Sequence, residues 1–338
     1  MSDNPTAAPF GSVFADYMAL ATMADGTYAY AGHAQPLENL SLHPATHVFH
    51  YGSGCFDGLK AHRQGSGRLA IFRLDDHVER LRRTVARLYM PVPDADMVRS
   101  MIIDAVEANA SVTPASPGSL YIRPTLIGTV PNIGAAAVPS ETGLLFVICS
   151  PVGDYFAGGV RPLTLYVETE IPRSTPQFGA VKSGANYVMA LGPTLAARNE
   201  HGADQVLFAA GDDITETGAA NFFLCDDNRV LTRALDESLL HGMTRDSIIS
   251  LASDLGYGVE ERRLSVAELK EWAGGGGEAF LTGTAAVVAP VGTLVIGEPL
   301  PVGDGLPGPN TLRLRDALTA LQAGDSPDQH GWLTEVGG

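Results

Sequence analysis

The sequence predicts a mixed α/β protein of two domains. Its 338 residues are 45% hydrophobic, which is enough for a large buried core and suggests more than one domain. Helical and strand-like patterns alternate in both halves without a regular βαβ period. A stretch rich in proline and glycine, residues 151–172, separates the halves. We therefore expect a small N-terminal α/β domain over residues 1–150, a connection over 151–172 and a larger C-terminal domain over 173–338.

The first half of the chain carries its clearest helix signal at residues 74–90. Apolar side chains share one helix face there, at spacings of three, four and three: Val78, Leu81, Val85 and Leu88. Residues 1–20 show no such pattern, and we expect a loosely held arm. The other elements expected in this half are a helix over 94–110 and buried strands over 120–127 and 144–149.

The second half mixes both kinds of element again and contains no internal repeat. Its patterns predict, in chain order, a helix over 187–200, strands over 205–210 and 220–225, a helix from Thr244, strands over 278–282 and 285–296, and a helix over 309–322. The glycines at 274–277 are expected to form a surface turn. They are not a phosphate loop, because no strand–GxxxxGK[ST]–helix context surrounds them.

Charge and cysteine content exclude several classes of protein. With 22 basic against 38 acidic residues, the net charge is −16, and such a surface repels nucleic acids and anionic membranes. Cys55, Cys149 and Cys225 are too widely spaced for a CxxC metal or redox site and suggest no disulfide framework. No secretory signal and no apolar run of the roughly 20 residues that a membrane span needs is visible. We expect a cytoplasmic protein that binds small molecules and no metal.

Lys182 is the first candidate for chemistry. The chain has three lysines, at positions 60, 182 and 270, and Lys182 lies among small residues in VKSGANY, residues 181–187. Small neighbours let the backbone pack close to a ligand, and a reactive lysine must lose its proton easily. By itself, however, a lysine in such a loop is more often exposed at the surface.

Three further motifs could hold a ligand with a ring nitrogen and a phosphate. In ITETGAANFF (214–223), Glu216 opens a loop of small residues, and a carboxylate there could keep a pyridine nitrogen protonated. In LTGTAA (281–286), Thr284 could present a hydroxyl and backbone N–H groups to an anion. GMTRD (242–246) opens a helix, whose free N–H groups suit a phosphate, although an N-capping threonine would give the same pattern.

These four motifs, in this order, resemble the class IV aminotransferases, the fold-type IV pyridoxal-phosphate enzymes, from about residue 25 to Trp332. Residues 50–58 (HYGSGCFDG), 71–73 (IFR) and 120–124 (LYIRP) resemble the branched-chain amino acid aminotransferases in particular. The resemblance implies a small N-terminal α/β domain and a larger, pseudo-barrel C-terminal domain that binds pyridoxal 5′-phosphate. It also implies reversible amino transfer between L-leucine, L-isoleucine or L-valine and 2-oxoglutarate.

The resemblance assigns the cofactor contacts residue by residue. Lys182 is implied to form a Schiff base with the cofactor and then to move a proton between the substrate and the cofactor. Glu216 is implied to pair with the pyridine nitrogen and Tyr187 to hydrogen-bond the phenolic oxygen. The groups implied to hold the phosphate are the side chain of Arg73, the backbone of Met243 and Thr244, and the hydroxyls of Thr244 and Thr284.

The substrate contacts follow from the same resemblance. Tyr121 and the backbone of Ala285 and Ala286, after Thr284, are implied to hold the α-carboxylate, and Arg123 to meet the side-chain carboxylate of glutamate. Two sets complete the implied pocket: an apolar wall of Tyr51, Phe56 and Gly58, and two positions that reach in from a neighbouring subunit, Ile133 and Ala135. The active unit is therefore expected to be a homodimer or a higher homo-oligomer.

Three positions depart from the commonest family pattern. Asp57 stands where most members carry glutamate, Ala220 where many bacterial members carry glutamate, and Val152 where some carry an aromatic residue. The redox CxxC of some mammalian members is absent, so no thiol switch is expected.

Two other interpretations remain open from the sequence. A D-amino-acid aminotransferase or an aminodeoxychorismate lyase would share Lys182 and Glu216 but would be expected to lack the Tyr121–Arg123 pair. A non-catalytic pyridoxal-phosphate carrier would not need every implied catalytic group. The preferred branched-chain substrate and the direction of the reaction in the cell are not determined by the sequence.

Overall fold

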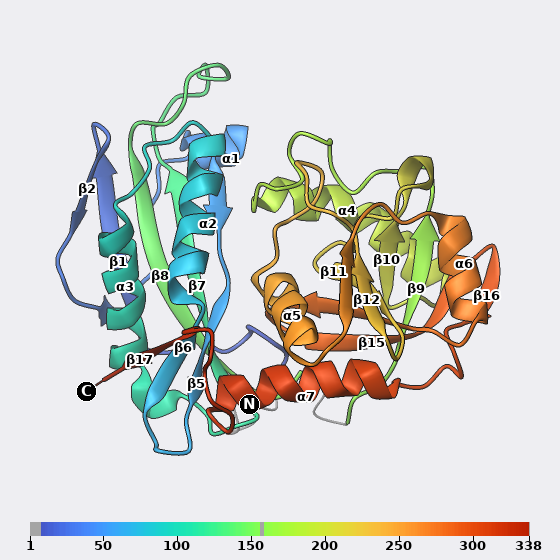
Figure 1. Ribbon diagram of the computed structural model, residues 1–338. Coiled ribbons are helices and arrows are strands. Elements are labelled where there is room, and N and C mark those ends of the chain that lie inside the picture. The colour runs from blue at the N-terminus through green and yellow to red at the C-terminus, as the bar shows by residue number, and fades with distance from the viewer. Residues whose placement is uncertain (1–7, 156–158, 338) are drawn as a thin grey trace. The chain divides into compact units, whose positions relative to one another are not determined.

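The computed structural model describes residues 8–155 and 159–337, which form two compact units (Figure 1). The first unit comprises Met1–Tyr155, Val181–Gly184 and Leu321–Gly338. The second comprises Phe156–Ala180 and Ala185–Ala320. The chain thus returns to the first unit twice, whereas the division expected from the sequence is linear.

The first unit is built on a nine-stranded antiparallel sheet. Its strand order is β17-β6-β5-β7-β8-β1-β2, with β3 paired to β1 and β4 to β7. The strands are β1 (Tyr17–Ala24), β2 (Thr27–Tyr30), β3 (Gln35–Pro36), β4 (Gly54–Phe56), β5 (Leu59–Arg63), β6 (Leu69–Phe72), β7 (Ser119–Gly128), β8 (Gly143–Val152) and β17 (Leu333–Val336). The helices are α1 (His47–Tyr51), α2 (Leu74–Arg87) and α3 (Ala95–Ala108), followed by a 3₁₀ turn, Ala110–Val112.

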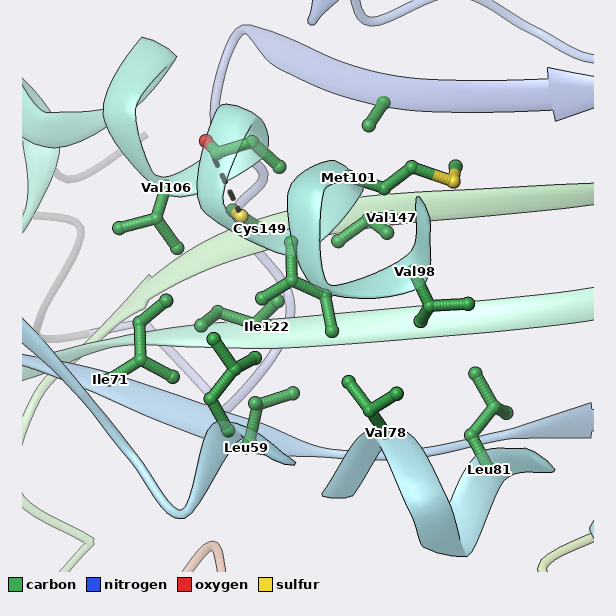
Figure 2. Packing of buried hydrophobic residues seen from close by; sticks show 14 of the residues in the cluster. Leu59, Ile71, Val78, Leu81, Val98, Met101, Val106, Ile122, Val147 and Cys149 are labelled. Atoms are coloured by element: carbon green, nitrogen blue, oxygen red, sulfur yellow. Dashed lines mark hydrogen bonds between the residues drawn. The ribbon is translucent and has the colours of Figure 1, made fainter. Parts of the chain in front are cut away.

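Helices α2 and α3 lie side by side against the sheet, and their apolar faces form the core of this unit (Figure 1). Figure 2 shows side chains from both helices meeting those of the strands: Val78 and Leu81 from α2, Val98, Met101 and Val106 from α3, and Leu59, Ile71, Ile122 and Val147 from the sheet. Burying each such side chain contributes roughly 1.5–3 kcal/mol. The thiol of Cys149 lies in the same core and donates to the carbonyl of Ala105 at 3.9 Å, and burial raises the pKa of Cys149 to about 12.

The second unit is built on an eight-stranded mixed sheet of order β10-β9-β15-β14-β11-β12-β13, with β16 on β15. Strand β9 runs parallel to β10 and β15, and β12 parallel to β13. The strands are β9 (Leu163–Glu168), β10 (Gln205–Phe208), β11 (Asn221–Cys225), β12 (Arg229–Thr232), β13 (Gly258–Glu261), β14 (Glu278–Gly283), β15 (Val287–Ile296) and β16 (Glu298–Pro301). The helices are α4 (Gly184–His201), α5 (Met243–Asp254), α6 (Val266–Gly274) and α7 (Pro309–Ala323), whose last residues belong to the first unit.

Every helix and strand named from the sequence is present, but two other expectations were wrong. Residues 163–168, placed in the connection, form strand β9 inside the second sheet, where Leu163, Leu165 and Val167 are buried. The expected arm ends earlier than residue 20, because β1 begins at Tyr17 and pairs with β8. Residues 1–7 of that arm and 156–158 of the connection lie outside the described residues. Among the helices that are described, none combines the length and the apolar character needed to span a membrane.

His62, on β5, has a buried Nε2 that lacks a hydrogen-bond partner among the described residues. Burial, and then the charge of nearby Lys60, lower the pKa of His62 to about 3. The folded chain therefore holds this imidazole neutral, whereas the unfolded chain protonates it below about pH 6.5.

We expect the stability of the protein to fall as the pH drops below about 6.5, because unfolding then takes up a proton at His62. This loss should continue down to about pH 3, with a slope of up to about 1.4 kcal/mol per pH unit. His62→Gln should make the slope shallower, whereas His33→Gln, at an exposed position, should leave it unchanged. Urea unfolding followed by circular dichroism across this pH range measures both slopes. Identical slopes for the wild type and His62→Gln would contradict the prediction.

Candidate functional site

The backbone around Lys182 is fixed within the first unit. The carbonyl of Lys182 accepts from the N–H of Phe56 at 3.1 Å, and its own N–H donates to the hydroxyl of Thr84 at 3.4 Å. The hydroxyl of Ser183 donates to the carbonyl of Gly54 at 2.9 Å. The backbone of Lys182 is therefore hydrogen-bonded to strand β4 and to helix α2. The side chain of Lys182 is half-buried, with Nζ 5.3 Å from the centre of the Phe56 ring.

Tyr121 and Arg123 project from the same side of β7, as their spacing of two residues predicts. Arg123 donates to the Tyr121 hydroxyl from Nε at 3.1 Å and from Nη2 at 2.7 Å. Its guanidinium lies 4.3 Å from the centre of the Phe56 ring. Phe56 thus lies near both Arg123 and Lys182, and Arg123 links Tyr121 to this group.

Gly58 is required by this arrangement, because a Cβ there would lie 2.2 Å from the Tyr121 hydroxyl. The Tyr121 ring also meets Phe10 edge-on, with ring centres 4.9 Å apart. Phe10 was not identified from the sequence, since the segment around it carries no periodic pattern that could have revealed the contact.

A buried network fixes the backbone between Phe56 and Gly58. The carboxylate of Asp57 is fully buried and accepts from Arg80 at 2.7 and 2.9 Å, from His77 Nδ1 at 2.7 Å and from the N–H of Gly58 at 2.7 Å. Burial alone would raise the pKa of Asp57, but Arg80 and His77 hold it well below its usual range. Burial also lowers the pKa of His77. Sequence reasoning noted Asp57 as a departure but missed its two partners on α2.

Of the two positions expected to reach a neighbouring subunit, Ile133 is 69% exposed, whereas Ala135 is buried within its own unit. The hydroxyl of Tyr51 donates to the carbonyl of Ile133. The carbonyl of Ala135 is within hydrogen-bond distance of His47 Nε2, at 3.3 Å. Ile133 therefore sits on a tethered loop with its apolar side chain outward.

Arg73 occupies a strained position at the start of α2. Its φ is +57°, a conformation that costs a residue with a side chain about 1–3 kcal/mol. The N–H of Arg73 donates to the carbonyl of Trp332 at 2.7 Å, and its guanidinium lies 4.9 Å from the centre of that indole. Nε lies 2.5 Å from the carboxylate of Asp76. These contacts orient a buried cation in the first unit.

Glu216 is the buried carboxylate of the second unit, with 2% of its surface exposed. Oε1 accepts from the N–H of Leu240 at 2.9 Å and lies 2.9 Å from Nη1 of Arg173. Oε2 accepts from the side-chain amide of Asn221 at 3.0 Å. The sequence marked Glu216 but gave no signal for Arg173, which lies 43 residues earlier in the chain.

The start of α5 adjoins this carboxylate through Asn221. The helix begins at Met243, and its N-cap is Gly242, which offers no side-chain cap to the first-turn N–H groups. Thr244 is buried inside the first turn, so it is not the N-cap residue. A Cβ on Gly242 would lie only 2.1 Å from the side-chain oxygen of Asn221, so only glycine fits there. An uncapped helix start is a site that an anion can fill.

Thr284, Ala285 and Ala286 form the turn between β14 and β15. The next residue, Val287, has φ +62°, which is a strained conformation for a β-branched residue. Nη1 of Arg315, on α7, donates to the carbonyls of Ala286 and Val288 at 3.1 Å each. Arg315 therefore holds the backbone on either side of Val287, at the end of this turn. The sequence did not mark Arg315. Tyr187 lies in the first turn of α4 and is half-buried.

These groups fit pyridoxal 5′-phosphate by their chemistry. Within the second unit, a buried carboxylate suits a protonated ring nitrogen, and a helix start without a side-chain cap suits a phosphate dianion. In the same unit, Thr282 Oγ1 is buried with no hydrogen-bond partner among the described residues. Within the first unit, taken by itself, Lys182 has a fixed backbone and a side chain that is not fully buried.

Comparison with known proteins gives a consistent picture. The sequence matches the family Amino-transferase class IV over residues 54–294. It is 38% identical over 333 residues to branched-chain amino acid aminotransferase 2, chloroplastic, of Humulus lupulus, covering 97% of this chain and 80% of that protein. It is 37% identical over 342 residues to branched-chain-amino-acid transaminase 1 of Bacillus subtilis, covering 98% and 95%.

Solved structures resemble this one as well. The T.th. branched-chain amino acid aminotransferase with pyridoxamine 5′-phosphate has a TM-score of 0.79 at 29% identity, covering 96% of this chain and 99% of that one. The Escherichia coli branched-chain amino acid aminotransferase has a TM-score of 0.78 at 28% identity, covering 96% and 100%.

Proposed function

We infer that this chain, which belongs to the class IV aminotransferases and within them to the branched-chain aminotransferases, transfers amino groups between L-leucine, L-isoleucine or L-valine and 2-oxoglutarate. Its cofactor is pyridoxal 5′-phosphate. The observation that supports the substrate class is the cluster of Lys182, Tyr121 and Arg123 around Phe56 in the first unit. A reactive amine, an apolar ring and a cation in one place suit substrates that are either apolar or acidic.

The cofactor contacts in this proposal are the ones that the resemblance to the family implies. Lys182 would bind it covalently, Glu216 would pair with its ring nitrogen and Tyr187 with its phenolic oxygen. Three kinds of group would bind the phosphate: the guanidinium of Arg73, the backbone N–H groups of Met243 and Thr244, and the hydroxyls of Thr244 and Thr284. When bound, the cofactor supplies an electron-withdrawing ring next to the substrate Cα. The amine of Lys182 then takes and returns the proton at that Cα.

Arg123 explains how one pocket accepts two kinds of side chain. Tyr121 and the backbone at Ala285 and Ala286 bind the α-carboxylate that all substrates share. Arg123 rests on the Phe56 ring and donates to Tyr121, so it has local partners when an aliphatic side chain is bound. When 2-oxoglutarate is bound, the same cation pairs with its second carboxylate. A D-amino-acid aminotransferase or a lyase of the same family would not need this pair.

We propose that the working unit is a homodimer or higher homo-oligomer in the cytoplasm. The exposed Ile133 supports a subunit contact beside the pocket, because Tyr51 tethers its loop. Helix α4 also exposes Val188, Leu191 and Leu195, which lie on one face at spacings of three and four. A second copy of the chain would cover such apolar surface. The three cysteines are free and buried, as suits a reducing compartment.

Lys182→Ala should lower transamination of L-leucine with 2-oxoglutarate by about 10³-fold or more, because no other amine takes the proton at Cα. Coupled measurement of glutamate formation gives the rate, and circular dichroism reports the fold. Lys270→Ala, at an exposed position on α6, is the matched control and should retain the wild-type rate. A Lys182→Ala rate near that of the wild type would exclude the assigned role.

Glu216→Gln should lower kcat by about tenfold or more, and it should weaken cofactor binding without preventing full loading when the cofactor is in excess. A neutral amide cannot hold the ring nitrogen protonated by its charge, but the phosphate contacts at Arg73, Thr244 and Thr284 remain. Steady-state rates, together with the bound cofactor released and counted by absorbance after denaturation, separate the two effects. An unchanged kcat at full loading would count against Glu216 as the ring-nitrogen partner.

Arg123→Ala should lower kcat/KM for glutamate and 2-oxoglutarate far more than for L-leucine and its oxo acid. Removing one partner of a desolvated charge pair costs about 2–5 kcal/mol, which corresponds to tens- to thousands-fold. L-leucine forms no such pair, so its half-reaction is the internal control. Stopped-flow measurement of each half-reaction gives the comparison. Equal losses for both substrates would assign Arg123 to the α-carboxylate or to the fold.

A further inference from the structure

We propose that Arg173 is a positioning residue that keeps Glu216 charged and correctly oriented toward the ring nitrogen of the cofactor. This inference rests on the function proposed above. Arg173 lies between β9 and Lys182 in the chain, within the second unit, and is 4% exposed. Its Nη1 lies 2.9 Å from Oε1 of Glu216.

The contact is a charge pair rather than a directed hydrogen bond. Neither Nε nor Nη1 of Arg173 has a hydrogen-bond partner, as judged over the residues that the structure describes. Two groups that donate to Glu216, the N–H of Leu240 and the amide of Asn221, are neutral. Arg173 therefore supplies a full positive charge that offsets the cost of burying the carboxylate.

A second buried carboxylate of this chain shows what a purely structural pair looks like. Asp57 accepts from two nitrogens of Arg80, one at each oxygen, as well as from His77 and Gly58. That geometry engages both oxygens in short, directed bonds. Glu216 instead receives its compensating charge without a directed bond from Arg173. The compensating charge at Glu216 is thus supplied separately from the directed bonds of Leu240 and Asn221.

Asn221 couples this carboxylate to the helix start that suits a phosphate. Its amide nitrogen donates to Oε2 of Glu216 and to the carbonyl of Leu240, each at 3.0 Å, while its oxygen packs against Gly242 at the N-cap of α5. The orientation of Glu216 is thus tied to the segment that would carry the other end of the cofactor. Arg173 adds the positive charge that the neutral donors Asn221 and Leu240 do not supply to Glu216.

The test compares two ligands that differ only at the ring nitrogen. Apo-protein is titrated with pyridoxal 5′-phosphate and with 1-deazapyridoxal 5′-phosphate, in which carbon replaces that nitrogen, and binding is followed by tryptophan fluorescence. Arg173→Met should weaken binding of pyridoxal 5′-phosphate by about tenfold or more and leave binding of the deaza analogue unchanged. Arg173→Lys, which keeps the charge, should recover most of the loss. A cavity of about 430 Å³ that Arg173 also lines leaves room for either side chain.

Equal weakening for both ligands, or no weakening for either, would overturn the role of Arg173. If Arg173→Met does not fold, as judged by thermal unfolding of the apo-protein, Arg173→Gln, which removes the charge but keeps a polar side chain, carries the same comparison: a loss confined to pyridoxal 5′-phosphate supports the proposal. Arg161→Met removes an exposed arginine–carboxylate pair in the same unit, with Asp204, and should affect neither ligand. Failure of the wild type to bind pyridoxal 5′-phosphate at all would instead refute the proposed function.

A double-mutant cycle gives a second, kinetic readout. If Arg173 acts through Glu216, Arg173→Met should lower kcat in the wild-type background by about tenfold but change it little in the Glu216→Gln background. Losses that multiply in the double variant would show that Arg173 acts independently of Glu216, and the positioning role would fall.

Discussion

The arrangement of the candidate site residues within the first unit depends on the buried carboxylate of Asp57. Taking a carboxylate out of water is costly unless its charge is compensated, and an arginine and a histidine of α2 provide that compensation. Because Asp57 is fixed, its two neighbours are fixed as well. Phe56 then binds the backbone of Lys182, and Gly58 leaves space for the hydroxyl of Tyr121. Residues more than 120 positions apart in the chain are held in one place by this short segment.

The second unit also buries a carboxylate, but it compensates the negative charge in a different way. Glu216 is as deeply buried as Asp57, but two of its donors are neutral, and the charge of Arg173 reaches it without a directed hydrogen bond. The contrast separates two uses of a buried carboxylate. One is fully engaged by its neighbours and stabilises the fold. The other is compensated in charge by Arg173 and, in our proposal, pairs with the ring nitrogen of the cofactor.

Two of the non-glycine residues with positive φ lie at or next to residues assigned to the site. Arg73 and Val287 both have positive φ, and each lies beside long-range contacts that hold it there: Trp332 for the first, and Arg315 on the carbonyls flanking the second. Each such residue costs about 1–3 kcal/mol, so the surrounding contacts must offset that amount.

The sequence by itself determined the family, the cofactor class and most of the secondary structure. Periodic apolar residues specify α2 and α3, and short motifs around Lys182 and Glu216 carry the chemistry, because both signals are local in the chain. Only the tertiary structure decided which charged side chains form buried ion pairs. The pairs Arg173–Glu216 and Asp57–Arg80 are 43 and 23 residues apart, and nothing in a local pattern marks them. The sequence also did not predict strand β9 of the second sheet, because its strand signal is short and lies among prolines and glycines. Burial is a property of the folded chain, and only burial makes each of these charged groups require its partner.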